Sequence, residues 1–182
     1  MKKKNQANLL ARECIVTALI QLCGQKPFSS ISISELTERA GVSRMTYYRN
    51  YCSKEEIFQS HMNEIVEAYR EDVCRIKRPE TYGEYENILH CCRYFERHKV
   101  FIACLLKVGM GNLLLDALSS YMISAYYTNK ESSELYYALM AYAGALFNVY
   151  IAWLKNGGRE PVEELADVIY AIPELSRSEC GV

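Results

Sequence analysis

The sequence has little proline and no excess of charge of either sign. Its 182 residues include four prolines, three histidines and one tryptophan, and 21 basic residues stand against 22 acidic ones, for a formal net charge of −1. Few prolines leave room for long helices. Half of the residues are hydrophobic, which excludes a disordered chain. The balanced charge excludes a chain that is basic throughout.

The motifs of common enzyme sites are also missing from the sequence. Gly109-Met110-Gly111 is followed by neither a third glycine nor a Lys-Ser/Thr pair, so it does not meet the phosphate-binding glycine patterns. The patterns G-x-S-x-G and H-E-x-x-H do not occur, and the scattered histidines and carboxylates form no recognisable catalytic group. We therefore expect a protein that is not an enzyme and that uses no cofactor and no metal ion.

Cysteine is abundant, with eight residues, but no C-x-x-C pair occurs. Zinc ribbons and thioredoxin-like sites are thereby excluded. Arg12 and Glu13 interrupt the apolar stretch that a secretory signal requires, so we expect a cytoplasmic protein with reduced thiols. The adjacent Cys91 and Cys92 leave a thiol-based redox-sensing regulator as an alternative.

Apolar residues recur at helical spacing along nearly the whole chain. No hairpin dipeptide lies between alternating runs, so the fold class is all-α. Thr81 with Glu84 predicts a capping box at one helix start. The pattern and its breaks predict about nine helices, over residues 7–23, 33–40, 44–50, 54–76, 82–97, 99–107, 112–127, 133–155 and 161–172.

One apolar stretch is long enough to span a bilayer. Leu135–Leu154 is 20 residues with almost no charge. Asn148, Gly144 and four tyrosines dilute its hydrophobicity, and such a helix can equally lie in a protein core or in a subunit interface. We favour the buried helix and expect no membrane partner, with a membrane-anchored helical protein as the alternative.

Three predicted helix starts lie close together between residues 32 and 58. Gly41 ends the first of these helices, as a residue that tolerates positive φ. Two short helices joined by a turn that contains glycine form a helix-turn-helix. The three starts share a serine N-cap, followed in two cases by a glutamate three residues later: Ser32 with Glu35, Ser43 alone, and Ser53 with Glu56.

The second helix of this motif carries side chains that suit a DNA groove, because the first turns of a recognition helix touch base edges. Arg44 suits a bidentate contact to guanine, Thr46 suits either base type, and Met45 suits a thymine methyl group. Solvated surface charge is the alternative for a basic residue here. Side chains that suit phosphates, which fix register without reading sequence, surround these positions: Ser43, Tyr48, Arg49, Asn50, Ser53 and Lys54.

Part of this stretch follows a recurring order, namely Ala40-Gly41-Val42-Ser43, Thr46-x-Tyr48, an aromatic Tyr51, and Ser53-Lys54-Glu55-Glu56-Ile57. The combination resembles the DNA-binding domain of the TetR family of bacterial transcriptional regulators. The resemblance implies that residues 43–50 are the recognition helix and that Lys54 contacts phosphate. Met45 stands where the family often has Gly or Pro, and Asn50 where it often has His or Tyr, so a different base preference is expected.

The C-terminal segments 143–157 and 161–166 are similar to the last two helices of many TetR proteins. Those helices usually form a homodimer interface, which small residues allow and an anchor residue such as Trp strengthens. Ordinary packing within one chain is the alternative. The candidate interface residues are Ala141, Gly144, Ala145, Asn148, Trp153, Leu165 and Ile169.

The resemblance also implies a small-molecule pocket in the C-terminal part. Residues 80–130 are rich in aromatic side chains, for which core packing is the alternative. The candidate pocket residues are Tyr94, Phe101, Met110, Tyr121 and Tyr126.

These features together predict a homodimeric DNA-binding regulator, a repressor that a small-molecule effector of unknown identity releases from a palindromic double-stranded operator. Residues 1–58 form the DNA-binding domain and residues 59–182 the effector-binding and dimerisation domain. Residues 1–60 hold nine basic and five acidic residues, a balance of +4, against −5 for the rest, which favours approach to DNA by the N-terminal part. A helical interaction protein or co-activator without its own operator is the alternative.

Overall fold

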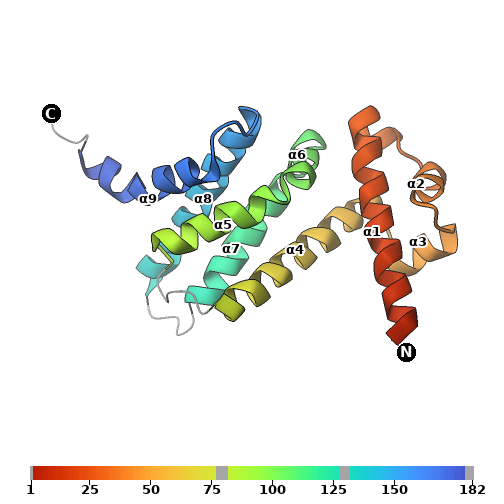
Figure 1. The fold of residues 1–182 in the computed structure, drawn as a ribbon, viewed down its shortest axis with the longest axis horizontal. Coiled ribbons are helices and arrows are strands. Elements are labelled where there is room, and N and C mark those ends of the chain that lie inside the picture. The colour runs from red at the N-terminus through yellow and green to blue at the C-terminus, as the bar shows by residue number, and fades with distance from the viewer. Residues whose placement is uncertain (1, 77–81, 128–131, 179–182) are drawn as a thin grey trace. The chain divides into compact units, whose positions relative to one another are not determined.

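A computed structural model of the chain describes residues 2–76, 82–127 and 132–178, with side chains described for 6–76, 82–127 and 132–172. In these ranges the chain forms nine α-helices and one short 3-10 helix, without a strand, which confirms the all-α prediction (Figure 1). The elements are α1 (Lys2–Gln25), η1 (Phe28–Ser30), α2 (Ile33–Ala40), α3 (Arg44–Asn50), α4 (Lys54–Ile76), α5 (Tyr85–Glu96), α6 (Lys99–Lys107), α7 (Asn112–Tyr126), α8 (Ser133–Lys155) and α9 (Val162–Ser178).

Five helices, α2, α3, α4, α6 and α8, have the bounds that the sequence predicts. The other four helices differ from prediction at one or both ends, most at the start of α1 and the end of α9. The helix α9 continues through Pro173 to Ser178 instead of ending at residue 172. The predicted capping box before α5 is not formed by Glu84, which stands at the N-cap without a side-chain cap hydrogen bond; its partner Thr81 lies outside the described residues.

The chain divides into two compact units. Unit 1 comprises residues 1–65 and 101–113, and unit 2 comprises residues 66–100 and 114–182. Unit 1 therefore includes part of α6 and the start of α7, which follow the predicted domain boundary at residue 58 by more than forty residues in the chain. The functional division at residue 58 stays a prediction.

Unit 1 is built around α1. Figure 1 shows α2 and α3 on the same side of α1, and the buried face of α1 includes Ile15 and Leu19, both 0% exposed. The helix α6 adds Phe101, whose ring centre lies 6.0 Å from that of Phe58 and 4.7 Å from that of His61. These apolar contacts hold the short helices α2 and α3, which are below the length at which isolated helices are stable.

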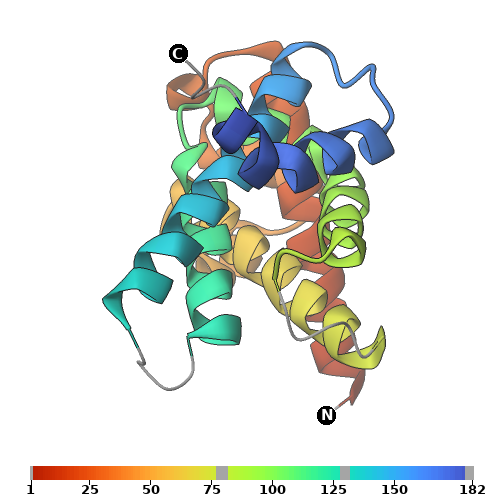
Figure 2. The ribbon, with the colours of Figure 1, turned by 90° about the vertical axis from the view of Figure 1, so that its left-hand side faces the viewer.

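Unit 2 is a layered set of helices in which α9 lies across α5 and α8 (Figure 2). Two side chains inside the unit are hydrogen-bonded to backbone carbonyls. The Tyr150 hydroxyl donates to the Phe95 carbonyl at 2.8 Å, and the Trp153 indole Nε1–H donates to the Glu160 carbonyl at 2.9 Å. Such buried bonds fix the register of the helices, since an unpaired buried donor costs free energy.

Two helices have the length and composition of a membrane span, Gln6–Gln25 within α1 and Ser133–Lys155, with 33% of each apolar window buried inside the protein. Core helices of soluble proteins meet the same criteria, so this finding is weak evidence for a membrane. In α8 the buried residues include Leu139, Ala143 and Leu146, whose spacing of three and four places them on one packed face.

Two buried tyrosines of unit 1 allow a matched stability test. Tyr47 is 0% exposed, and its hydroxyl has no hydrogen-bond partner in the described part of the chain; burial raises its pKa to about 12. The Tyr51 hydroxyl is hydrogen-bonded to the Arg12 guanidinium. We expect Tyr47→Phe to keep the free energy of unfolding or raise it by up to ~1 kcal/mol, and Tyr51→Phe to lower it by about 1–2 kcal/mol, in urea unfolding. The reverse order would contradict this assignment of the hydroxyls.

Candidate functional site

The turn between α2 and α3 is closed by a glycine in the left-handed region. Gly41 has φ 66° and ψ 29° and stands at the C-terminal end of α2. Its N–H donates to the Glu38 carbonyl at 3.1 Å, and the Val42 N–H donates to the Thr37 carbonyl at 3.0 Å. This pair of bonds is a Schellman motif. It ends α2 sharply and sets the direction in which α3 leaves.

Serine hydroxyls satisfy the free N–H groups at the starts of α2, α3 and α4. The Ser43 hydroxyl accepts from the Thr46 N–H at 3.1 Å, and the Ser53 hydroxyl accepts from the Glu56 N–H at 3.2 Å. The Glu56 carboxylate in turn accepts from the Cys52 N–H at 2.6 Å. Ser32 plays the same part at α2. The predicted helix starts therefore form as local cap structures.

The helix α3 has one face in the core and one face in solvent. Tyr47 points inward and is fully buried. Met45 and Tyr48 are 72% and 60% exposed, although both are large and apolar. The Tyr48 ring rests edge-on against Tyr47, with ring centres 5.2 Å apart, which orients Tyr48 at the surface. Packing within unit 1 does not account for Met45 and Tyr48 on this face.

The polar side chains of α3 are held near the same surface. Arg44 is exposed and donates from its guanidinium to the Ser34 hydroxyl of α2. The Thr46 hydroxyl bonds the Ser43 hydroxyl at 3.0 Å, and the Asn50 amide donates to the Thr46 carbonyl at 2.8 Å. All the predicted residues of α3 except Asn50 and Thr46, which are half-buried, are exposed.

Lys54 joins two distant parts of unit 1, a role that its position at the start of α4 does not indicate. Its ammonium donates to the carbonyls of Phe28 and Ile31, each at 2.7 Å, and lies 4.6 Å from the centre of the Phe28 ring. The acceptors precede it by 26 and 23 residues, so no local pattern could reveal them. Lys54 thus ties the start of α4 to the turn between α1 and α2, and its contact to phosphate stays a prediction.

Three of the predicted interface residues are packed inside unit 2. Trp153, Leu165 and Ile169 are 3%, 7% and 1% exposed, so their side chains do not reach the surface of the protomer. Their apolar character serves packing between α8 and the helices beside it, a correction to the predicted role. Ala141 and Asn148 are exposed, whereas Gly144 and Ala145 are half-buried.

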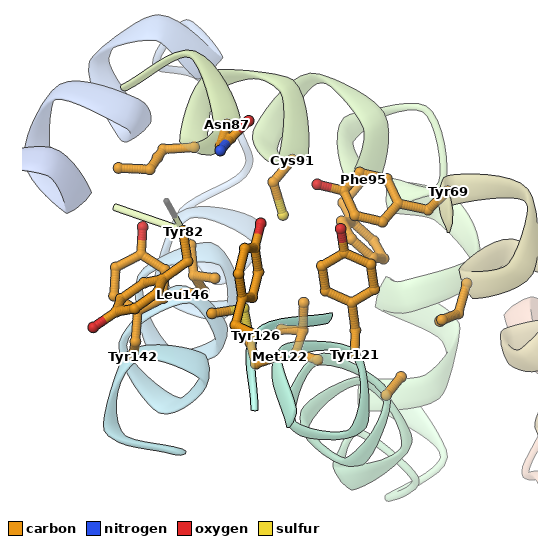
Figure 3. A pocket seen from close by; sticks show the side chains of 14 residues that line it. Tyr69, Tyr82, Asn87, Cys91, Phe95, Tyr121, Met122, Tyr126, Tyr142 and Leu146 are labelled. Atoms are coloured by element: carbon orange, nitrogen blue, oxygen red, sulfur yellow. The ribbon is translucent and has the colours of Figure 1, made fainter. Parts of the chain in front are cut away.

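The structure brings Tyr121 and Tyr126 to the lining of one pocket in unit 2 (Figure 3). Tyr94 does not line it and is buried against Tyr69, with 5.0 Å between ring centres. Tyr82, which belongs to the aromatic-rich segment 80–130, also lines the pocket, whereas sequence reasoning missed Tyr69 and Tyr142.

Phe101 and Met110, the two remaining pocket candidates, belong to unit 1 and do not line the pocket. Phe101 is 4% exposed and packs on Phe58. The backbone N–H of Met110 donates to the Leu105 carbonyl at 2.8 Å, in the turn after α6. Packing on Phe58 explains the aromatic character of Phe101, and neither residue has its predicted place in the pocket.

The two adjacent cysteines have little thiolate character. Burial raises the pKa of Cys91, and it raises that of Cys92 to about 12. A thiol reacts as its thiolate, so this environment makes both cysteines poor redox sensors at neutral pH. Among the described residues, no group of three or more His, Cys, Asp or Glu side chains is arranged to hold a metal ion.

A helix-turn-helix with a capped and exposed second helix is the arrangement that DNA-binding regulators use to place a recognition helix in the major groove. The family model for "Bacterial regulatory proteins, tetR family" matches residues 15–60, and that for "Transcriptional regulator C-terminal region" matches residues 84–174. The chain therefore belongs to the TetR family, as the sequence predicts. Members of this family are DNA-binding transcription factors and not enzymes, which confirms that expectation as well.

Solved structures share the fold over nearly the whole chain. The "Dihydroxyacetone kinase operon activator DhaS" has a TM-score of 0.62 at 16% identity, covering 92% of this chain and 96% of its own. A TetR regulator from Rhodococcus sp. RHA1 has a TM-score of 0.54 at 19% identity, with coverage of 97% and 99%. The fatty acid degradation regulator FadR from Bacillus halodurans has a TM-score of 0.56 at 17% identity, with coverage of 89% and 93%. No curated protein matches the sequence.

The double contact of Lys54 yields a stability prediction. Lys54→Met removes a charged donor from two carbonyls, and we expect it to lower the free energy of unfolding by about 2 kcal/mol. Lys26→Met is the control, because Lys26 forms only a partly exposed ion pair with Glu35 and its loss costs below ~1 kcal/mol. Urea unfolding measures both variants. An equal decrease in the free energy of unfolding for Lys54→Met and Lys26→Met would show that Lys54 acts as an ordinary surface charge.

Proposed function

We propose that this protein is a homodimeric, cytoplasmic transcriptional repressor that a small molecule releases from its operator. In this proposal residues 1–58 bind DNA, and residues 59–182 bind the effector and form the dimer. Each protomer places residues 43–50 in a major groove. The two half-sites then lie about 34–36 Å apart, or a multiple of that distance, on a near-palindrome.

The exposed face of α3 is the observation that carries the proposal. Large apolar side chains at a surface usually mark an interaction site, and Met45 and Tyr48 are 72% and 60% exposed on a helix that Tyr47 anchors. The exposed Arg44 and Arg49 share this short helix. Apolar contact with a thymine methyl group and arginine contact with guanine are both forms of base readout, and this face offers them together.

The contacts to phosphate fall around the ends of α3. We assign them to the hydroxyls of Ser43, Tyr48 and Ser53, to Arg49 and Asn50, and to Lys54. Arg44, Met45 and Thr46 read the bases in this assignment. Arg44 first has to leave the Ser34 hydroxyl, which costs little because both groups are exposed and water replaces the lost bond.

We assign the dimer interface to an exposed face of α8. Residues 137, 140, 141, 144 and 148 recur at spacings of three and four, so they share one helix face. Tyr137 is 69% exposed and Met140 is 37% exposed. A methyl group added at Gly144 would have no heavy atom within 4 Å, so the protomer leaves this position open. Small residues beside exposed apolar ones allow a second helix to approach closely.

The effector acts by favouring one arrangement of the dimer over another. One arrangement fits the operator and the other does not. The effector shifts the equilibrium between them only as far as it binds one more tightly than the other. The pocket in unit 2, which Tyr121 and Tyr126 help to line, is the place we assign to it. The direction of regulation is tested by whether added effector lowers or raises operator affinity.

Replacing Arg44 tests the base contact. We expect Arg44→Ala to relax the preference at one base position of each half-site and to weaken operator binding by about 1–3 kcal/mol per contact. Binding to an operator and its single-base variants would measure both effects. Arg159→Ala, an equal change of charge in unit 2, should leave the base preference unaltered. An Arg44→Ala protein with the wild-type base preference would contradict the assignment.

Replacing Gly144 tests the interface. We expect Gly144→Leu to leave the protomer folded, since the position is open, and to weaken the dimer at least about tenfold by steric conflict with the partner helix. Analytical ultracentrifugation would measure the change in dimer dissociation. Ala138→Leu, an exposed substitution on another face of α8, is the control. A Gly144→Leu protein that dimerises like the wild type would rule out this face.

A further inference from the structure

The pocket in unit 2 has a chemistry that narrows its ligand. We infer that it takes a flat, uncharged aromatic molecule that carries a hydrogen-bond acceptor such as a ketone oxygen. That this molecule is the effector rests on the proposed function, whereas its binding depends on the pocket alone. The inference is carried by three properties of the lining: its rings, its lack of charge and one unused hydroxyl donor.

Aromatic rings dominate the pocket, and they come from four helices and the segment before α5 (Figure 3). The rings stand edge to face at short separations. The ring centres of Tyr82 and Tyr142 lie 5.0 Å apart, and those of Tyr121 and Tyr126 lie 6.4 Å apart. Ring faces and edges at these distances favour another ring over an alkyl chain, because offset and edge-to-face contacts add to the burial of apolar area.

The pocket is narrow. The space between its lining side chains, mouth included, is about 480 Å³, but the free interior is only about 30 Å³, which is room for one or two water molecules. A ligand must therefore displace side chains as it enters. A flat molecule that slides between ring faces requires the least displacement, which disfavours bulky or branched ligands.

Charged side chains are absent from the described residues that line the pocket. Its polar groups are the Asn87 amide, the Cys91 thiol and the tyrosine hydroxyls, and burial raises the pKa of Tyr121 and of Tyr142, so these remain neutral phenols at physiological pH. A carboxylate or an ammonium group would lose its water there without gaining an opposite charge.

Arg70 is the cation to consider as a partner for an anionic ligand. Its guanidinium lies over the ring of Tyr121, 5.1 Å from the ring centre, and its Nε lies 3.4 Å from a Glu67 carboxylate oxygen. It does not line the pocket. Its charge is balanced by Glu67, so a neutral ligand is favoured over an anion.

One buried hydroxyl of the pocket lacks a hydrogen-bond partner among the described residues. The Tyr69 hydroxyl is hydrogen-bonded to the Cys91 thiol, and the hydroxyls of Tyr121 and Tyr126 bond one another. The buried hydroxyl of Tyr142 has no hydrogen-bond partner in the described part of the chain. A buried donor left unpaired is unfavourable, so an acceptor on the ligand satisfies Tyr142 and gains from it.

Three probes of nearly one shape separate these properties. They are 2-acetylnaphthalene, which carries a neutral acceptor, naphthalene, which carries none, and 2-naphthoate, which carries a charge. Titration calorimetry on the full-length protein should give the tightest binding for the ketone and at least about tenfold weaker binding for the carboxylate.

A variant tests the hydroxyl of Tyr142. Tyr142→Phe should weaken binding of the ketone about fivefold, the effect of one hydrogen bond, and leave the affinity for naphthalene within about twofold of the wild type. Tyr170→Phe, which removes an exposed hydroxyl from α9 outside the pocket lining, should change neither.

The results that would contradict the inferred ligand class differ from those that would contradict the proposed repressor function. No binding of the ketone, equal binding of the carboxylate, or an equal effect of Tyr142→Phe on ketone and naphthalene would each overturn it. Operator release is measured separately with the same probes. Release by a charged molecule without ketone binding would keep the proposed repressor and overturn the inference, whereas ketone binding of the expected kind without release would keep the inference and contradict the effector role.

Discussion

The need to satisfy backbone groups at helix ends is the constraint on which the exposed surface of α3 depends. Three helices begin between residues 33 and 54, and each start leaves N–H groups without a partner inside its helix. Serine hydroxyls accept from these groups at α2, α3 and α4, and the left-handed backbone of Gly41 closes the turn. Because the caps and Tyr47 hold α3, the large side chains of Met45 and Tyr48 can remain exposed on its outer face.

The sequence predicts this part of the fold well, because the signals are local. A cap serine, a glutamate three residues on and a glycine all act within one turn of the helix they bound, and the bounds of α2 and α3 follow from them. The contacts of Lys54 and the place of Phe101 in unit 1 were not predictable in this way. Both join residues far apart in the chain, and no spacing rule connects such partners.

The C-terminal half shows the limit of residue type as a signal. Trp153, Leu165 and Ile169 have the character of interface anchors, yet they are buried within the protomer, since a core and an interface require the same apolar side chains. Of the aromatic candidates for an effector pocket, Tyr121 and Tyr126 line a cavity in unit 2, whereas Tyr94 and Phe101 pack elsewhere. Family membership carries the regulatory role, while the identity of the bound molecule has to come from the chemistry of the pocket lining.

Selection of random double-stranded DNA by the purified full-length protein tests the central claim most directly, which is that two copies of α3 read one symmetric operator. The account predicts enrichment of a near-palindrome whose half-sites are centred about 10 base pairs apart, or a multiple of that spacing. Enrichment of a single site without two-fold symmetry, or binding that depends on salt alone and favours no sequence, would contradict it.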